Sequence, residues 1–411
     1  MSYDPRGASL GDTPITAEPI MRHVPTGAIA MALMLTACAE PDANVSAPSR
    51  ALARPQAVLG PADATVVMRG LNNPRGLAFG PDGALFVAEA GRGGTGPCFQ
   101  SGQLVCYGPT GAIGRLANGV QDTVVSGLPS YANSAGRAEG PNAISLLGMG
   151  GAYVTIGLES DPSNRALAPE FAGFARLVHV APTALVPRAA RVPNGLAQWE
   201  FVADLGDYEI AVNPDCGRID DNPFGVLVAP EGVLVVDAGA NAIVRMDATG
   251  RLSTFAALPS RYSEPTGPAC PALPADYPTT LPTETVPTSI AVGPDGAYYV
   301  GQLAGFPVVA GGAKIYRVEA GSPPTVFLGG FTFVIGVAFD ATGTLYVLQH
   351  VDGPGMTATG SLVRVAADGT RTTVIAGLTR PTGLAIGADG AIYISHRGIS
   401  VGTGEVLRIQ P

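Results

Sequence analysis

Four polar side chains share one position in the sequence pattern, at the end of a short apolar segment. Glu89, Gln302, Gln349 and His396 close the segments LFVAE, YYVGQ, LYVLQ and IYISH. Carboxylate, amide and imidazole groups can bind a metal ion, hold a ligand by hydrogen bonds or transfer a proton. If the segments are equivalent strands, these side chains emerge at the same level of the fold.

Further polar residues stand at equivalent segment ends or where an apolar segment begins. We expect them to converge with the first four on one mouth of a central channel, the default place for a ligand. The alternative is that solvated strand ends are polar without any function. The predicted ligand-binding face comprises Arg75, Glu89, Asn142, Asn222, Asp237, Gln302, Gln349, His350 and His396.

Calcium is the one cofactor that part of this face would suit, because Ca²⁺ prefers oxygen ligands. The candidate ligands are Glu89, Asn142, Asn222 and Asp237. His350 and His396 are unsuited to calcium; they could act as base and orienter in a hydrolase, or make ordinary polar contacts. The loop 213–225 contains three aspartates but lacks the order of an EF-hand loop. No common catalytic or phosphate-binding motif is present, so no catalytic residue is assigned.

The elements that would position these residues are repeats. The stretch 77-LAFGPDGALFVAEAG-91 returns as 290-IAVGPDGAYYVGQL-303 and 384-LAIGADGAIYISHRG-398, and weaker matches bring the copies to six. Each copy has two apolar segments, mostly joined by a Gly-containing turn suited to a tight hairpin, and third and fourth segments follow in several copies. Four antiparallel strands repeated six times predict an all-β, six-bladed β-propeller; an eight-stranded barrel is the alternative.

The ends of the repeat region predict how the ring closes. The sixth copy has three strands, and the segment 64-ATVVMRGL-71, which precedes the first copy, can supply the fourth. An N-terminal strand that completes the last blade would hide two strand edges. The wider spacing of the early copies predicts insertions at 159–195 and 258–286, which are either binding elements or padding.

The first sixty residues read as a targeting segment followed by a linker. A basic end at Arg22, an apolar run and the tetrapeptide Leu-Thr-Ala-Cys ending at Cys38 follow the order of a secretory signal, and the tetrapeptide resembles a bacterial lipobox. A disordered tail with a chance match is the alternative. The predicted divisions are an upstream extension over 1–20, a lipoprotein signal peptide over 21–37, a flexible tether over 38–61 beginning at lipidated Cys38, and the propeller over 62–411.

Cysteine usage and net charge agree with export and lipid anchoring at the periplasmic or outer surface of a bacterial membrane. We predict the disulfides Cys98–Cys106 and Cys216–Cys270, which an oxidising compartment favours. Zinc binding is the alternative, but no CxxC spacing is present. The net charge of −9 and the pI near 5.0 argue against a nucleic-acid partner. The lipid on Cys38 is the only membrane contact that we expect.

Several segments resemble the ScyD/ScyE family, exported NHL-like propellers first named from scytonemin gene clusters. The segments are NNPRGLAFGPDGALFVAEAG, NPDCGRIDDNPFGVLV, VVDAGANAIVRMDATG, VPTSIAVGPDGAYYVGQLAGFP and PTGLAIGADGAIYISHRG, within residues 62–411. The resemblance implies a periplasmic or surface propeller of NHL repeats. It implies no assigned reaction or catalytic residue, and it does not imply scytonemin synthesis.

We therefore predict an anchored binding module whose loop face holds a protein, a glycan or a small molecule. One alternative is a calcium-dependent lactonase or esterase similar to the gluconolactonases and paraoxonases. Glu89, Asn142 and Asp237 would mimic the inner-strand Glu, Asn and Asp of those enzymes, although the flanking Asn-Asp-Gly signature is absent. The other alternative is an accessory protein of a secondary-metabolite pathway. Fold alone does not choose among them.

Overall fold

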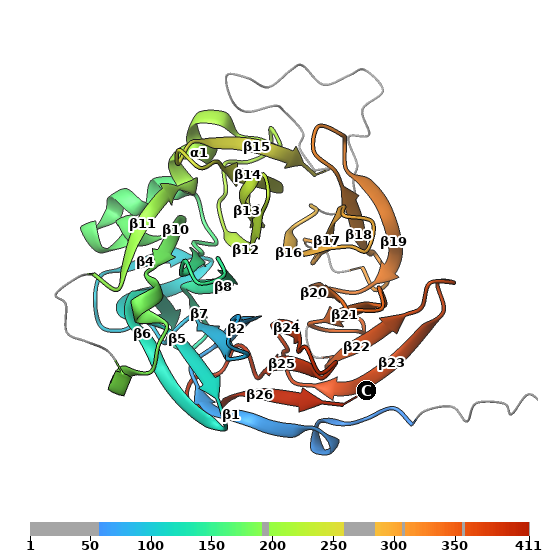
Figure 1. The fold of residues 1–411 in the computed structure, drawn as a ribbon. Coiled ribbons are helices and arrows are strands. Elements are labelled where there is room, and N and C mark those ends of the chain that lie inside the picture. The colour runs from blue at the N-terminus through green and yellow to red at the C-terminus, as the bar shows by residue number, and fades with distance from the viewer. Residues whose placement is uncertain (1–56, 191–196, 259–283, 306–308, 356–357, 411) are drawn as a thin grey trace, which may run out of the picture. The chain divides into compact units, whose positions relative to one another are not determined.

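Six antiparallel sheets surround a central axis and form a six-bladed β-propeller (Figure 1). The computed structural model describes residues 57–190, 197–258, 284–305, 309–355 and 358–410. The predicted fold class is confirmed, including the four-stranded blades. The predicted extension, signal peptide and most of the tether lie outside the described residues, as do Cys38 and Cys270.

Each blade starts at the channel and runs outward. From the channel outward, blade 1 contains β2 (Pro74–Phe79), β3 (Leu85–Glu89), β5 (Gln103–Ala117) and β6 (Val120–Asn133). Blade 2 contains β8 (Pro141–Leu146), β9 (Ala152–Ile156), β10 (Arg176–Val180) and β11 (Trp199–Asp204). Blade 3 contains β12 (Pro223–Ala229), β13 (Gly232–Asp237), β14 (Ala242–Met246) and β15 (Leu252–Ala257).

Blades 4 to 6 repeat this order, and the last blade takes its outer strand from the N-terminal side of the chain. Blade 4 contains β16 (Pro287–Val292), β17 (Tyr298–Gln302), β18 (Ala313–Val318) and β19 (Thr325–Phe331). Blade 5 contains β20 (Val334–Phe339), β21 (Leu345–Gln349), β22 (Gly360–Val365) and β23 (Arg371–Leu378). Blade 6 contains β24 (Gly383–Ile386), β25 (Ile392–His396), β26 (Gly404–Ile409) and β1 (Thr65–Leu71).

The repeated Asp-Gly turns explain why the first two strands of these blades form hairpins. Gly83, Gly296 and Gly390 adopt positive φ angles of 76° to 80°, which glycine tolerates at low cost. In each turn the preceding aspartate accepts a hydrogen bond from the backbone two residues on, as Asp82 does from Ala84 N at 3.1 Å. The same aspartates pair with arginines of the third strand at 2.7–2.8 Å. These turn residues are therefore structural.

β1 closes the ring, as the sequence predicts. It pairs antiparallel with β26, from Thr65 opposite Arg408 to Leu71 opposite Gly404. Figure 1 shows β1, in blue, beside β26, in red. Met68 and Leu71 are buried in a cluster that joins blades 6 and 1 and includes Leu77, Leu85, Val87 and Val406.

Blades 1 and 2 depart from the simple repeat. The range 159–195, expected to be an insertion, contains β10, so it supplies a blade strand; the 3-10 helices η2 (Pro162–Leu167) and η3 (Pro169–Gly173) precede that strand. The helix α1 (Leu205–Val212) follows β11 and lies at the periphery near β15 (Figure 1). The other expected insertion, 258–286, lies largely outside the described residues.

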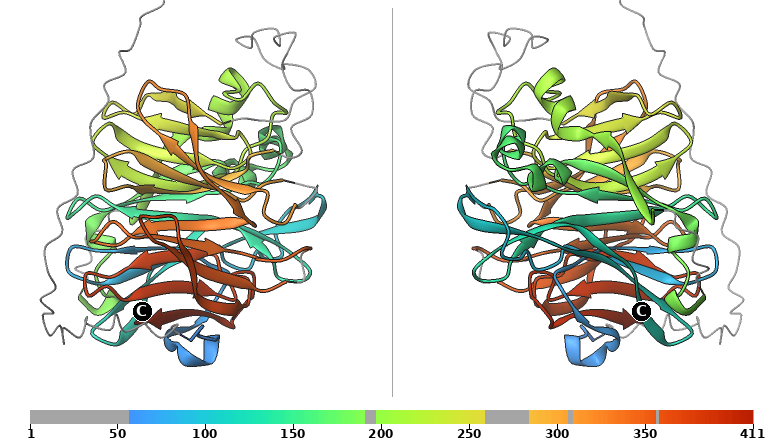
Figure 2. Two further views of the ribbon diagram at one scale, coloured as in Figure 1. Left: turned by 90° about the vertical axis from the view of Figure 1, so that its right-hand side faces the viewer. Right: turned by 90° about the vertical axis from the view of Figure 1, so that its left-hand side faces the viewer.

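Blade 1 carries a further hairpin, in which β4 (Cys98–Ser101) pairs with the start of β5. It projects from one face of the disk in the side views (Figure 2). The predicted Cys98–Cys106 disulfide is confirmed and joins the two strands of this hairpin. Cys216 is also disulfide-bonded; because its expected partner Cys270 lies outside the described residues, that pairing stays a prediction.

Replacing Met68 by Ala should test ring closure. Met68 is fully buried where β1 joins the last blade to the first, so we expect a loss of about 2–5 kcal/mol in the free energy of unfolding, measured by urea denaturation. Val120→Ala is the control, because Val120 is exposed and its loss should cost less than about 0.5 kcal/mol. Equal stabilities of the two variants would contradict the placement of β1.

Candidate functional site

The mouth of the channel is built from two rings of side chains, one residue per blade in each. Successive residues of an extended segment point in opposite directions, so residues two apart face the channel together. The upper ring, immediately before the first strand or its proline, is Asn73, Gly140, Asn222, Val286, Phe333 and Arg380. The lower ring, two residues on, is Arg75, Asn142, Phe224, Thr288, Ile335 and Thr382.

These rings enclose a cavity of about 480 Å³. Nine of the twelve ring residues line it, all but Asn73, Gly140 and Asn142. Below it a narrower space of about 100 Å³ is lined by Asn142 and by the next residues of the first strands, including Leu77, Ile144 and Leu384. The channel is therefore wide at this mouth and narrow further in.

The upper ring has an unusual backbone. Asn73, Val286, Phe333 and Arg380 have φ angles of 43° to 51°. Positive φ is uncommon for residues other than glycine and is a true outlier for a β-branched residue such as Val286. The carbonyl oxygens of these residues accept hydrogen bonds from amides that follow the second strand, for example Phe333 O from His350 N at 2.8 Å. The fold thus maintains a strained ring at the cavity, a feature that often marks functional sites.

The polar residues at the ends of the second strands hold the ring segments in place. Glu89 accepts a hydrogen bond from Asn72 N at 2.7 Å and Asp237 accepts one from Asn222 N at 2.8 Å. Gln349 and His396 accept in the same way from Thr332 N and Thr379 N, whereas Gln302 accepts from Lys314 N in the next strand. Burial raises the pKa of both Glu89 and Asp237 to about 6, although these backbone donors lower it.

The structure therefore divides the predicted face into two groups. Arg75, Asn222 and His350 line the cavity, and Asn142 lies just below it. The remaining members are buried and make the hydrogen bonds just described: Glu89, Asp237, Gln302, Gln349 and His396.

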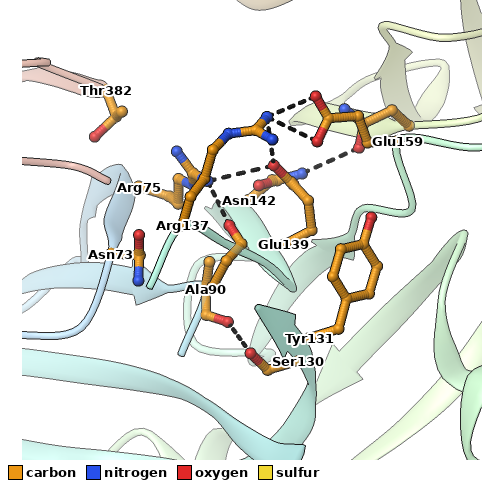
Figure 3. Close-up of polar contacts among 12 residues, drawn as sticks. Asn73, Arg75, Ala90, Ser130, Tyr131, Arg137, Glu139, Asn142, Glu159 and Thr382 are labelled. Carbon is orange, nitrogen blue, oxygen red and sulfur yellow. Dashed lines mark hydrogen bonds and ion pairs between the residues drawn. The ribbon is translucent and has the colours of Figure 1, made fainter. Parts of the chain in front are cut away.

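A charged network occupies the blade 1 and blade 2 side of the cavity (Figure 3). Arg137 binds Glu159 through two contacts of 2.6 and 2.7 Å and lies 3.5 Å from Glu139. Arg75 is buried, donates to Ala138 O at 2.7 Å and lies 3.4 Å from Glu139. Burial raises the pKa of Glu139, and burial lowers the pKa of Arg75 while Glu139 opposes that change.

The disulfide-linked hairpin of blade 1, formed by β4 and the start of β5, lies beside this network. Ser101 at its tip donates a hydrogen bond to Glu159 O at 3.1 Å. A second hollow, lined by Ser101, Gln103, Arg137 and Asp220 among others, adjoins the cavity there. Arg137 and Glu139 were not predicted from the sequence because they belong to the connection after β6, which has no counterpart in the other copies. Glu159 lies just beyond the end of β9, at an exit that every blade has, so the repeat could have indicated it.

The opposite side of the cavity is mainly apolar and carries two basic side chains, His350 and Arg380. Val286, Leu303, Phe333, Ile335 and Ile399 form its wall. His350 Nδ1 lies 2.9 Å from Pro381 O, a carbonyl that can only accept, so Nδ1 carries the proton and Nε2 is left as an acceptor. Burial lowers the pKa of His350 to about 4, so the imidazole is neutral at pH 7.

Three of the predicted calcium ligands, Asn142, Asn222 and Asp237, are neighbours, and the fourth, Glu89, belongs to blade 1. Asp237 Oδ1 accepts three backbone hydrogen bonds, from Asn222, Gly239 and Ala240. Asn142 Nδ2 lies 3.4 Å from Asn222 Oδ1, and Glu89 binds the backbone of its own blade. Within the described residues, no group of three or more His, Cys, Asp or Glu side chains is arranged to hold a metal ion. Calcium binding stays a prediction.

Comparison with known proteins supports the fold alone. No family model and no curated protein matches the sequence. Among solved structures, the PQQ-bound aldose sugar dehydrogenase of Streptomyces coelicolor is 13% identical with a TM-score of 0.50, over 84% of this chain and 96% of that one. A putative gluconolactonase is 14% identical, TM-score 0.45, over 85% and 93%, and virginiamycin B lyase from Staphylococcus aureus is 14% identical, TM-score 0.44, over 83% and 85%.

Glu209 makes stability at the blade 2–blade 3 junction depend on pH. It lies on α1 and is 1% exposed, so its carboxylate is removed from water. Burial, together with Asp237 and Asp215, raises its pKa to about 9. The fold therefore favours the protonated carboxyl, and this stabilisation, complete below the unfolded pKa of about 4.5, is lost as pH rises toward 9.

We predict that Glu209→Gln is more stable than the wild type at pH 8 and that the advantage shrinks toward pH 5. The difference should change by up to about 1.4 kcal/mol per pH unit between the two pKa values, measured from urea denaturation across that range. Glu170→Gln is the control, because Glu170 is exposed. Parallel pH profiles for Glu209→Gln and the wild type would refute the assignment.

Proposed function

We propose that the protein is an exported, lipid-anchored propeller that binds a small molecule in the cavity at the channel mouth. The observation that carries this proposal is the ring of left-handed residues around the cavity. Val286, Phe333 and Arg380 keep an unfavourable backbone, and all three line the cavity. Strain of this kind persists where the surrounding fold imposes it, and it is concentrated at ligand-binding positions.

The size and the lining of the cavity also favour a small ligand. Its volume of about 480 Å³ lies within the range of roughly 300–1,000 Å³ usual for small-molecule sites. An apolar wall faces a few convergent polar groups, which is the composition that gives such sites both affinity and orientation.

We rank binding above hydrolysis because His350 would be a poor general base. It is the cavity imidazole with a free ring nitrogen, but its pKa of about 4 makes it a much weaker base than an ordinary histidine. General bases work best with a pKa near the working pH. A calcium-dependent lactonase and a pathway accessory remain the alternative functions.

Two features support export and anchoring. The Cys98–Cys106 disulfide is of the kind that persists in oxidising compartments, and the sequence places the Leu-Thr-Ala-Cys tetrapeptide directly after an apolar run. No helix in the described parts of the chain is long and apolar enough to cross a membrane. In this proposal the lipid on Cys38 holds the propeller at the membrane.

Filling the cavity should abolish binding without disturbing the blades. Ile399 lines the cavity from a half-buried loop position, so Ile399→Trp adds bulk at the mouth. We expect the dissociation constant for the uncharged dye N-phenyl-1-naphthylamine, measured by fluorescence titration, to rise at least about tenfold. Val401→Trp, in the same loop but outside the cavity lining, should bind as the wild type does. Equal binding by both variants would place the dye elsewhere and contradict the proposed site.

Cys38→Ala should release the protein from the membrane. Without the thiol no diacylglyceryl group can be attached, so we expect the variant in the soluble fraction and without label after growth of an expressing bacterium in radioactive palmitate. The wild type should be labelled and sediment with membranes. An unlabelled wild type would contradict the anchor while leaving the cavity proposal intact.

A further inference from the structure

We propose that the cavity ligand is an apolar organic anion, whose carboxylate or sulfonate pairs with Arg380 while its hydrocarbon or aromatic part lies on the wall formed by Val286, Phe333 and Ile335. This inference rests on the proposed function, because it names the class of ligand for the same cavity.

Arg380 is the lining arginine with no partner of its own. Among the described residues it makes no side-chain hydrogen bond and no ion pair, and its Nη1 is buried. Arg380 as a whole is half-buried, so water reaches part of the guanidinium, but an unsatisfied buried donor such as its Nη1 costs free energy and calls for a partner. An anion in the cavity would supply that partner.

The other two lining arginines already have counter-charges. Arg75 lies 3.4 Å from Glu139, and Arg137 lies 2.6 Å from Glu159. Asp220 pairs with Arg218, and Glu284 has a partner as well. The neutral His350 beside Arg380 adds no charge. The lining contains three arginines and four carboxylates, and within the described residues Arg380 is the arginine of this set that no carboxylate contacts.

The position of Arg380 directs its side chain to the cavity. It is the blade 6 member of the upper ring, with a φ angle of 46°, and its carbonyl accepts a hydrogen bond from Gly398 N at 2.9 Å. Phe333, the blade 5 member, lies beside it in the ring order, with Ile335 directly below. A guanidinium adjacent to an apolar wall recognises a molecule that has a charged end and an apolar body.

The test compares two dyes that share one aromatic skeleton. The anionic probe is 8-anilinonaphthalene-1-sulfonate, and the uncharged probe is N-phenyl-1-naphthylamine. We expect the wild type to bind the anionic dye about ten- to a hundredfold more tightly, because a charge-assisted pair contributes that much. Arg380→Gln should remove this preference while binding the uncharged dye within about twofold of the wild type, which also shows that the variant is folded.

Arg364→Gln is the matched control, since it removes one positive charge from an exposed position on β22 and should keep the preference. Arg380→Lys should retain part of it. A preference that survives in Arg380→Gln, or a wild type that binds both dyes equally, would overturn the anion assignment while the cavity proposal stands. If Ile399→Trp weakens neither dye, the proposed function itself fails.

Discussion

The pairing of β1 with β26 is the interaction on which the remaining structure depends. A propeller blade alone leaves its edges and its apolar faces uncovered, and the blades become stable by packing on both neighbours. In this chain the two ends of the repeat region meet in one sheet, and Met68 and Leu71 join the clusters of the last and first blades. Because the ring is closed there, all six first strands are held around one axis and the channel has a fixed diameter.

The closed ring also determines how the residues at the mouth of the channel are arranged. Each first strand begins at the same level, so one residue per blade reaches the upper ring and one reaches the lower ring. The buried acceptors Glu89, Asp237, Gln349 and His396 then satisfy backbone amides of the segments that lead into the strands. The bond to Thr332 N is buried, so leaving that amide without a partner would cost about 1–3 kcal/mol, and the other bonds are partly buried. Polar side chains at strand ends thus stabilise the site indirectly, while other residues line it.

The sequence predicted most of the fold because each blade repeats the same local signals. The segments 141–146, 287–292 and 334–339 coincide with β8, β16 and β20, since a glycine turn and an apolar alternation define them without help from distant residues. The strand β10 was not predicted because two 3-10 helices precede it in blade 2 and no turn motif marks its beginning.

The site was harder to predict than the fold, for two reasons. Arg137 and Glu139 lie in a connection that has no counterpart in the other blades, so an alignment of the copies could not place them beside Glu159. The upper ring does have a sequence signal, the residue just before the first strand of every copy. That signal is concealed because Val286, Phe333 and Arg380 are not residue types that favour positive φ, and a backbone conformation imposed by tertiary hydrogen bonds leaves no trace in local propensity.

One residue per blade in each ring has a consequence for how such a protein diversifies. Several lower-ring residues also hydrogen-bond to the blade beside them: Asn142 donates to Pro223 O, Thr288 to Val334 O and Thr382 to Pro74 O. Effects of substitutions at well-separated positions are close to additive. Substitutions on opposite sides of the mouth are therefore expected to combine independently, whereas neighbouring lower-ring positions are coupled through these bonds and have to change together when the ligand changes.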